Sequence, residues 1–268
     1  MIEDVRRPRD TVILAYHRVN EVRPDALSVR TSELRRQLSY LLDAGYRNLS
    51  LEELSRRLRR ERPPRERCFA ITFDDGYRDG LTDALPVLRE LGCTATFFLT
   101  ADYLGSGRPF PWDEGKFPAL GPLDLALDDR EVGALLEAGM SIGSHTCSHP
   151  LLATVPLARA RDEIERSKAV LEARFGVPVR TFCYPAGSLN DAVVECVAQA
   201  GYVAGVVTPP RPGIRETLFT LRRVGVYQGS TLGRFRLRVH PLWSRLRDAA
   251  WELRGAAGGG GRAAEGRS

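Results

Sequence analysis

The stretch Ile71-Thr72-Phe73-Asp74-Asp75-Gly76 joins a predicted strand to a predicted site. It completes an apolar, β-prone run that begins at Cys68, and it ends on two adjacent carboxylates and a glycine. Burying two carboxylates at the end of a strand is costly unless a partner neutralises them, and a metal ion is one such partner. An Asp-Gly pair can equally close a β-hairpin. The stretch alone therefore leaves a hairpin turn and a metal site as alternatives.

The composition is that of a globular protein. The chain has 268 residues, with 43% apolar and 27% charged residues and a net charge of +5, which allows one large α/β domain or two small ones. The five cysteines are scattered, which favours a reduced compartment over a disulfide framework. Since no signal-peptide pattern or membrane-spanning apolar window is visible, we expect a cytoplasmic protein with no nucleic-acid partner.

Short apolar runs alternate with helical patterns along most of the chain. We predict strands at 12–17, 68–73, 94–99, 140–144, 181–184, 202–207 and 223–227. We predict helices at 31–45, 80–91, 128–139, 156–175 and 191–200, and a further helix that begins at residue 50. Seven strands that alternate with helices indicate a parallel α/β fold. Residues 101–127 have no clear period, and we predict a long loop that covers a site.

Polar residues at the strand ends favour a (β/α) barrel over a doubly wound sheet. His17, the Asp74-Asp75 pair, His145 and the Tyr184-Pro185 pair each lie at, or just beyond, the carboxyl end of a predicted strand. Barrel active sites form at that end of the strands. A doubly wound sheet usually carries a Gly-rich phosphate loop, and the sequence shows none.

Two of the four histidines, His145 and His149, stand four residues apart. In an extended strand they would lie about 13 Å apart, whereas in a helical turn they share one face at about 6 Å. A turn after the fourth strand would bring them together, and one carboxylate of the Asp pair would complete a three-ligand metal set with open positions. Non-haem iron oxygenases use a similar set, but their carboxylate usually lies close to the first histidine.

Five segments together resemble the polysaccharide deacetylases, carbohydrate esterase family 4. The segments are Thr72–Gly76, His145–His149, Tyr16–Val19, Thr94–Phe98 and Phe182–Gly187. The resemblance extends from about residue 11 to residue 227. It implies a distorted (β/α) barrel with about seven parallel strands. It also implies hydrolysis of the N-acetyl group of an amino sugar with a divalent metal ion, for which we expect zinc.

The resemblance also implies roles for individual residues. Asp75, His145 and His149 would bind the metal ion, and Asp74 would be the general base. The ion would acidify a water molecule and polarise the acetyl carbonyl, while Asp74 takes the water's proton. A backbone N–H near Tyr184 would help to bind the oxyanion.

The acid and the residue that orients the base are less directly indicated. His17 resembles the acid of a permuted branch, the poly-N-acetylglucosamine deacetylases, and we predict that it protonates the leaving amine. His240 is the alternative, because many members place this histidine late in the chain. Many members also carry an arginine in the third motif, where Cys183 stands here. Arg223 could replace it, although a purely structural ion pair is equally consistent with the sequence.

Tyr184 and Pro185 are the predicted substrate-binding residues of the third motif. Trp112, on the long loop, could stack on a sugar ring or pack among the loop's own aromatic residues. Cys147, between the two histidines, is expected to pack in the core rather than bind metal.

The predicted catalytic domain covers residues 1–230. Residues 231–254 form a basic amphipathic segment with Trp243 and Trp251, which predicts a helix that packs on the domain or contacts the inner face of a membrane. Residues 255–268 are rich in glycine and expected to be disordered.

These features predict a metal-dependent deacetylase acting on an N-acetylated polysaccharide, oligosaccharide or lipid-linked precursor. An amidase of the same fold that acts on a non-sugar amide is one alternative. A non-catalytic sugar-binding module is another, although such a module needs no base beside its metal ion.

Overall fold

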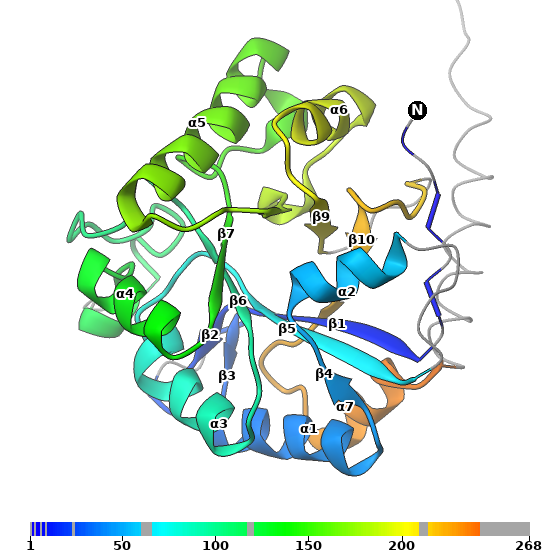
Figure 1. Cartoon of the computed structure of the whole chain (residues 1–268). Helices are drawn as coiled ribbons and strands as arrows, with labels where there is room; N and C mark the ends of the chain where they lie inside the picture. Colours follow the sequence, from blue (N-terminus) through cyan, green and yellow to red (C-terminus); the bar gives the residue numbers. More distant parts are fainter. Residues whose placement is uncertain are drawn as a thin grey trace, which may run out of the picture.

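The computed structural model describes residues 2, 4–5, 7–8, 10–22, 25–59, 66–116, 121–208 and 214–241 (Figure 1). Parallel strands form a sheet that curves into a nearly closed barrel, and helices surround it. The predicted distorted (β/α) barrel is therefore confirmed. Among the described residues, no helix is long and apolar enough to cross a membrane.

The main sheet has the strand order β10-β9-β8-β7-β6-β5-β1-β11, and β4 pairs with the first residues of β5. A separate pair, β2 and β3, follows β1. The strands are β1 (Thr11–Tyr16), β2 (Arg18–Val19), β3 (Ser28–Val29), β4 (Arg47–Asn48), β5 (Cys68–Phe73), β6 (Thr96–Leu99), β7 (Ser141–Ser144), β8 (Thr181–Cys183), β9 (Ala204–Val207), β10 (Leu221–Arg222) and β11 (Val224–Gly225). The sequence did not predict β2, β3 or β4, because two residues are too few to show a period.

The helices lie close to their predicted positions. They are α1 (Thr31–Asp43), α2 (Leu51–Leu58), α3 (Leu85–Glu90), α4 (Asp129–Glu137), α5 (Leu157–Phe175), α6 (Asp191–Gln199) and α7 (Leu232–Val239), with a π-helix at Gly80–Ala84 and short 3₁₀ turns at Pro122–Asp124, Leu152–Thr154 and Pro185–Gly187. Side-chain caps start three of them, and at α2 the Ser50 hydroxyl accepts the Glu53 N–H. The Asp128 carboxylate accepts the Glu131 N–H at α4, and Asn190 accepts the Val193 N–H at α6.

A single short segment closes the barrel. Leu221 and Arg222 pair with β9, while Val224 and Gly225 pair with β1, so that Arg223 lies between two strand ends. The predicted seventh strand at 223–227 was wrong in its bounds, because the segment starts earlier and changes partner at Arg223.

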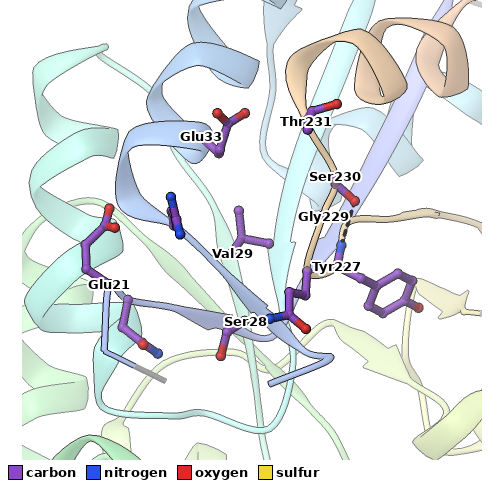
Figure 2. A pocket seen from close by; sticks show the side chains of 11 residues that line it. Glu21, Ser28, Val29, Glu33, Tyr227, Gly229, Ser230 and Thr231 are labelled. Carbon is purple, nitrogen blue, oxygen red and sulfur yellow. Dashed lines mark hydrogen bonds between the residues drawn. The ribbon is translucent and has the colours of Figure 1, made fainter. Parts of the chain in front are cut away.

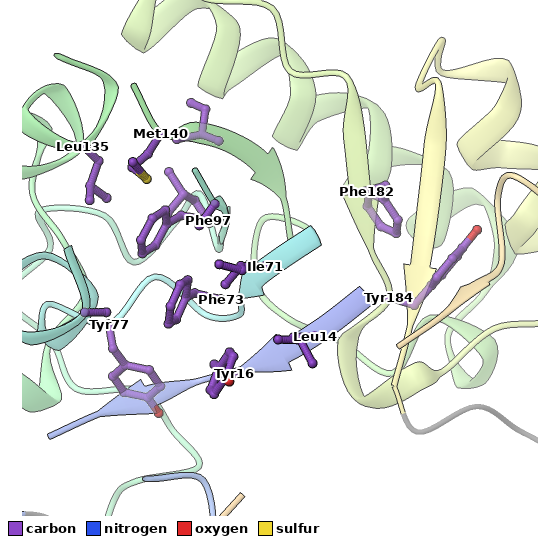
Figure 3. Packing of buried hydrophobic residues seen from close by; sticks show 14 of the residues in the cluster. Leu14, Tyr16, Ile71, Phe73, Tyr77, Phe97, Leu135, Met140, Phe182 and Tyr184 are labelled. Carbon is purple, nitrogen blue, oxygen red and sulfur yellow. The ribbon is translucent and has the colours of Figure 1, made fainter. Parts of the chain in front are cut away.

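The two-residue period of β5 separates two parts of the core. Phe69, Ile71 and Phe73 pack in the large cluster beneath the surrounding helices, whereas Cys68 and Ala70 belong to the smaller cluster. Figure 3 shows Phe73 between the rings of Tyr16 and Phe97, whose centroids lie 5.5 and 4.8 Å away. By the same period, residues 72 and 74 face the side opposite to these aromatic rings.

In the described residues, the predicted helix at 231–254 is interrupted after α7. α7 ends at Val239, and His240 has an extended backbone before Pro241, which is the conformation that a following proline favours. Phe235 and Val239 are buried in the main cluster. This part of the segment therefore packs on the domain. Trp243, Trp251 and the predicted disordered residues 255–268 lie outside the described residues.

Candidate active site

Asp74, directly after β5, is clamped by a buried arginine. Arg223 donates from Nη1 to Asp74 Oδ1 and from Nη2 to Oδ2, both at 2.6 Å. The same guanidinium donates to the hydroxyls of Thr72 and Thr208 and to Cys183 Sγ. Two parallel charge-assisted bonds fix the plane of a carboxylate. The structure therefore places Arg223 where the sequence predicted a residue that orients the base.

The ion pair controls the protonation of Asp74. Burial by itself raises the pKa of this carboxyl, but the charge and hydrogen bonds of Arg223 outweigh burial and hold the pKa well below its usual range. Asp74 is therefore ionised at neutral pH. Each carboxylate oxygen keeps a second lone pair beyond the one that Arg223 occupies, so the side chain can still accept a proton.

His17 follows β1 and lies beside the same carboxylate. Its Nε2 is 3.7 Å from Asp74 Oδ2, and its ring centroid is 6.0 Å from that of Tyr227. His240, the alternative acid, is exposed at the end of α7. Of the two candidates, the structure brings His17 to Asp74. Its acid role stays a prediction.

Asp75, His145 and His149 form a cluster whose ligand atoms lie within 4.8 Å of one another. Asp75 Oδ1 is 3.4 Å from His145 Nε2 and 3.5 Å from His149 Nε2. Those distances are long for hydrogen bonds. Ligand atoms that each lie about 2.1 Å from a tetrahedral zinc ion are roughly 3.4 Å apart. The two nitrogens and one oxygen could therefore hold a divalent metal ion, and the identity of that ion stays a prediction. Cys147 is buried and lies outside this cluster.

Backbone strain and hydrogen bonds aim the three ligands. Asp75 and His149 have positive φ values of 70° and 62°, which non-glycine residues rarely adopt. His145 Nδ1 donates to the carbonyl of Cys183 at 2.8 Å, which leaves Nε2 directed at Asp75. Gly76 also has a positive φ, and a Cβ there would lie 2.9 Å from Leu99 Cδ2.

The two imidazoles have opposite pKa shifts. Burial lowers the pKa of His149 to about 4, so this ring is neutral at pH 7, which is the form that binds metal. Burial would also lower the pKa of His145, but Cys183 and the Asp75 carboxylate outweigh burial and raise it well above its usual value. A divalent ion would compete with that proton.

Trp112 forms a wall beside His149. The two ring centroids are 4.2 Å apart, and Phe110 stacks on Trp112 at 4.8 Å. Trp112 Nε1 donates to the Tyr77 hydroxyl at 2.8 Å, and that hydroxyl donates to Asp113 Oδ2 at 2.5 Å. The described part of the long loop is thus packed by its own aromatic residues. A role for Trp112 in sugar stacking stays a prediction.

A buried charge cluster anchors the same loop, and sequence reasoning missed it. Arg18 is fully buried and pairs with carboxylates from three separate segments. These are Asp25 at 3.2 Å, Asp113 at 3.7 Å and Asp79 at 3.9 Å, together with a close contact to Asp124. Burial raises the pKa of Asp79 to about 8. Only the position of Arg18 directly after His17 could have indicated its importance.

Comparisons with known proteins agree with this geometry. A family model described as polysaccharide deacetylase matches residues 61–205. The protein YxkH of Bacillus subtilis (strain 168) is 30% identical over 224 residues, which cover 83% of this chain and 74% of YxkH. The chain belongs to the polysaccharide deacetylase family. It is thereby a member of a family of carbohydrate-deacetylating hydrolases, as the motifs predicted.

Two further relatives support the assignment. The poly-beta-1,6-N-acetyl-D-glucosamine N-deacetylase of Escherichia coli (strain K12) is 35% identical over 80 residues, or 29% of this chain and 12% of that protein. The structure of the Streptococcus pyogenes deacetylase PplD in complex with acetate matches with a TM-score of 0.72 at 24% identity. The match covers 90% of this chain and 99% of PplD, and it shows that the two share the barrel fold.

In this deacetylase, the third-motif residues Tyr184 and Pro185 are buried. The Tyr184 N–H donates to Val206 O, and the Gly187 N–H donates to Tyr184 O. The predicted oxyanion donor near Tyr184 is therefore not Tyr184's own amide. Proline has no N–H, which leaves Ala186, an exposed residue with a φ of 49°, as the candidate donor in this turn. Substrate contact by Tyr184 or Pro185 stays a prediction.

The deacetylase also has a polar cleft of about 270 Å³ at the same end of the barrel. It lies between the segment 20–33 and the segment 227–231, which follow β1 and β11 (Figure 2). Glu21, Ser28, Glu33 and Thr231 are among its lining residues. Tyr227 also lines it, and in Figure 2 its ring is turned away from Glu21 and Glu33. That ring is the one that packs beside His17.

Proposed function

We propose that this chain is a metal-dependent hydrolase that removes N-acetyl groups from an amino sugar. The observation that carries the proposal is the pairing of two adjacent carboxylates with different partners. Asp75 faces two imidazole nitrogens at metal-ligand spacing, while Asp74 is held ionised by Arg223. Sugar binding alone would need the first feature but not the second.

Asp75, His145 and His149 would hold the ion, and zinc is our proposed ion because it favours nitrogen and oxygen ligands at tetrahedral spacing. Such an ion supplies an acidified water and a polarised acetyl carbonyl. Asp74 accepts the proton that the attacking water loses. Arg223 keeps the Asp74 carboxylate from rotating, so its free lone pairs keep one direction.

The leaving nitrogen needs a proton, and His17 is placed to give it. As the water oxygen adds to the acetyl carbon and the C–N bond breaks, His17 donates a proton to the leaving amine and acetate is released. The 3.7 Å separation between His17 Nε2 and Asp74 Oδ2 supports one shared reacting centre for the proposed acid and base. A proton taken up by Asp74 can then return to His17.

The polar cleft supports a substrate longer than one sugar. It opens beside Tyr227, which packs against His17, so a neighbouring sugar unit could occupy it while the N-acetyl group reaches Asp74. Its carboxylate and hydroxyl lining can hydrogen-bond sugar hydroxyls. Acetate release from N-acetylglucosamine oligomers of increasing length tests this point. Equal kcat/KM for one sugar and for four would contradict it.

The mechanism is tested with Asp74→Asn and His145→Ala, and with His240→Ala as the control. We expect Asp74→Asn to lose acetate release but keep zinc, and His145→Ala to lose both. His240→Ala should keep both, since His240 is exposed directly after α7. Full activity of Asp74→Asn or His145→Ala would refute the mechanism. Activity on acetylated amides but on no acetylated sugar would favour the amidase alternative.

We further propose that the chain acts in the cytoplasm, where α7 contacts the membrane surface. Leu237 is 53% exposed on α7, beside the exposed Arg234 and Arg236. An apolar residue among arginines suits an anionic lipid surface. Co-sedimentation with anionic but not with neutral vesicles is the expected result, and equal binding to both would contradict it.

A further inference from the structure

Glu163 is a buried carboxylate that lies beside the turn carrying the two histidines. It belongs to α5, and only 4% of the residue is exposed. Its Oε2 accepts the N–H of Cys147 at 3.0 Å and the N–H of Ser148 at 2.9 Å, and its Oε1 accepts the Ser148 hydroxyl at 2.6 Å. All three donors lie between His145 and His149 in sequence.

The turn has a backbone shape that creates a site for an anion. Thr146 and His149 have positive φ values of 69° and 62°, and the consecutive N–H groups of Cys147 and Ser148 point to one oxygen. Such consecutive amides form a concave nest that binds negative charge. Two non-glycine residues at positive φ cost free energy, and they persist only where the surroundings fix them.

The opposite side of the turn is fixed as well. Its carbonyls, at Thr146 and Cys147, accept the N–H groups of Ala101 and Asp102 at 3.1 and 3.0 Å. The backbone between the two histidines is thus held by the loop after β6 on one side and by Glu163 on the other. Of these two supports, Glu163 alone supplies a full negative charge.

We propose that Glu163 is a positioning residue for the metal site. By occupying the nest, it fixes the turn so that the Nε2 atoms of His145 and His149 both face Asp75 Oδ1. Within the described part of the chain, the hydrogen bonds of Glu163 go to Cys147 and Ser148 rather than to these three side chains, so it acts through the backbone between two of them. The proposal rests on the proposed metal site and adds the residue that preorganises two of its ligands.

The test is the zinc affinity of the metal-free full-length chain, measured by competition with a chromogenic chelator. Residues that support metal ligands typically contribute 10–100-fold to metal affinity, so we expect Glu163→Gln to weaken zinc binding by about 10–100-fold. The matched control is Glu165→Gln, on the same helix. Glu165 is half exposed and pairs with Arg161, and its replacement should leave zinc affinity unchanged.

A second variant keeps the test decisive if Glu163→Gln does not fold. Ser148→Ala removes one of the three donors and keeps the backbone nest, so we expect a smaller loss of zinc affinity in a protein that melts near the wild type. Wild-type affinity in both folded variants would overturn the role of Glu163. A wild-type chain that binds no zinc would instead refute the proposed metal site, so the two failures are distinguishable.

Discussion

Replacing Arg223 by alanine should both destabilise the barrel and change how its stability depends on pH. The guanidinium is 1% exposed and makes two bonds to Asp74, one to each of the hydroxyls of Thr72 and Thr208, and one to Cys183 Sγ. The substitution leaves the Asp74 carboxylate buried without its counter-ion. Breaking a buried ion pair in this way typically costs about 3–5 kcal/mol, which we expect at neutral pH.

The sign of the pH effect follows from the two opposing influences on Asp74. In the wild type, Arg223 outweighs burial and depresses the pKa. Asp74 therefore contributes stability above its unfolded pKa of about 3.9, and this is lost as the pH falls through the lower folded pKa. Without Arg223, burial dominates and raises the pKa, so the variant loses stability as the pH rises above about 4. The difference between the two proteins should be larger at pH 8 than at pH 4.5.

The assay is denaturant unfolding of both proteins at these two pH values in the presence of a chelator, with acetate release measured in parallel. Arg223→Lys keeps the charge but cannot form the bidentate pair, so it should recover part of the stability and little of the activity. Arg222→Lys, at the neighbouring position, is the control: it removes the Nη2 hydrogen bond to Ile214 O but does not touch Asp74, so it should leave the activity and the pH dependence of stability unchanged. A loss below 1 kcal/mol for Arg223→Ala, or the same loss at both pH values, would refute the reasoning.

Burial raises the pKa of Asp79 to about 8, so between about pH 4 and pH 8 the folded state holds a proton that the unfolded state releases, and stability falls as pH rises. Asp79→Asn removes this dependence. The free energy of unfolding of this variant, relative to that of the wild type, should therefore increase from pH 5 to pH 8. A constant difference would contradict a raised pKa for Asp79. Gly76→Ala puts a Cβ 2.9 Å from Leu99 Cδ2 at a φ of 82°. It should lower the free energy of unfolding by about 1–3 kcal/mol, which a lower thermal midpoint would show. An unchanged midpoint would mean that the turn relaxes without strain. Tyr77→Phe removes the hydroxyl that links Trp112 Nε1 to the buried Asp113 carboxylate. This should lower the free energy of unfolding by about 1–3 kcal/mol. Wild-type stability would show that water replaces the hydroxyl.

Two features of the sequence predicted the site best: the alternation of side chains along β5 and the polar residues at the carboxyl ends of the strands. In β5, every second residue faces the large aromatic cluster, which sends Asp74 to the opposite side with Thr72. Parallel strands also place their carboxyl ends on one side of the barrel, so residues far apart in the chain meet there. That argument brought His17, Asp74 and His145 together without any knowledge of distances, and in the structure their side chains lie close together.

The buried charged residues that hold the loop and the turn around the site were harder to predict. Their partners are distant in sequence and show no local pattern. Arg18 pairs with Asp113 and Asp124 on the long loop, and Glu163 binds a turn on another element. Each is a charged residue in a segment whose sequence is typical of an exposed surface. Burial of a charge depends on which counter-charges the fold brings near, so a pattern of single residues cannot reveal it.

Arg223 supplies the clamp on Asp74 that Cys183, in the third motif, cannot supply. Many members carry an arginine in the third motif, but here the arginine comes from the segment that pairs with β9 on one side and β1 on the other. A second arginine at position 183 would bring another cation into the space where Cys183 Sγ already accepts from Arg223 Nη2 at 3.1 Å. A small side chain at 183 is therefore a requirement of placing the arginine at 223. Because the residue that clamps Asp74 also lies at the barrel's closing segment, any opening of 221–225 would release this carboxylate, which is our proposed base. Closure of this barrel and the orientation of the Asp74 carboxylate thus depend on the same side chain.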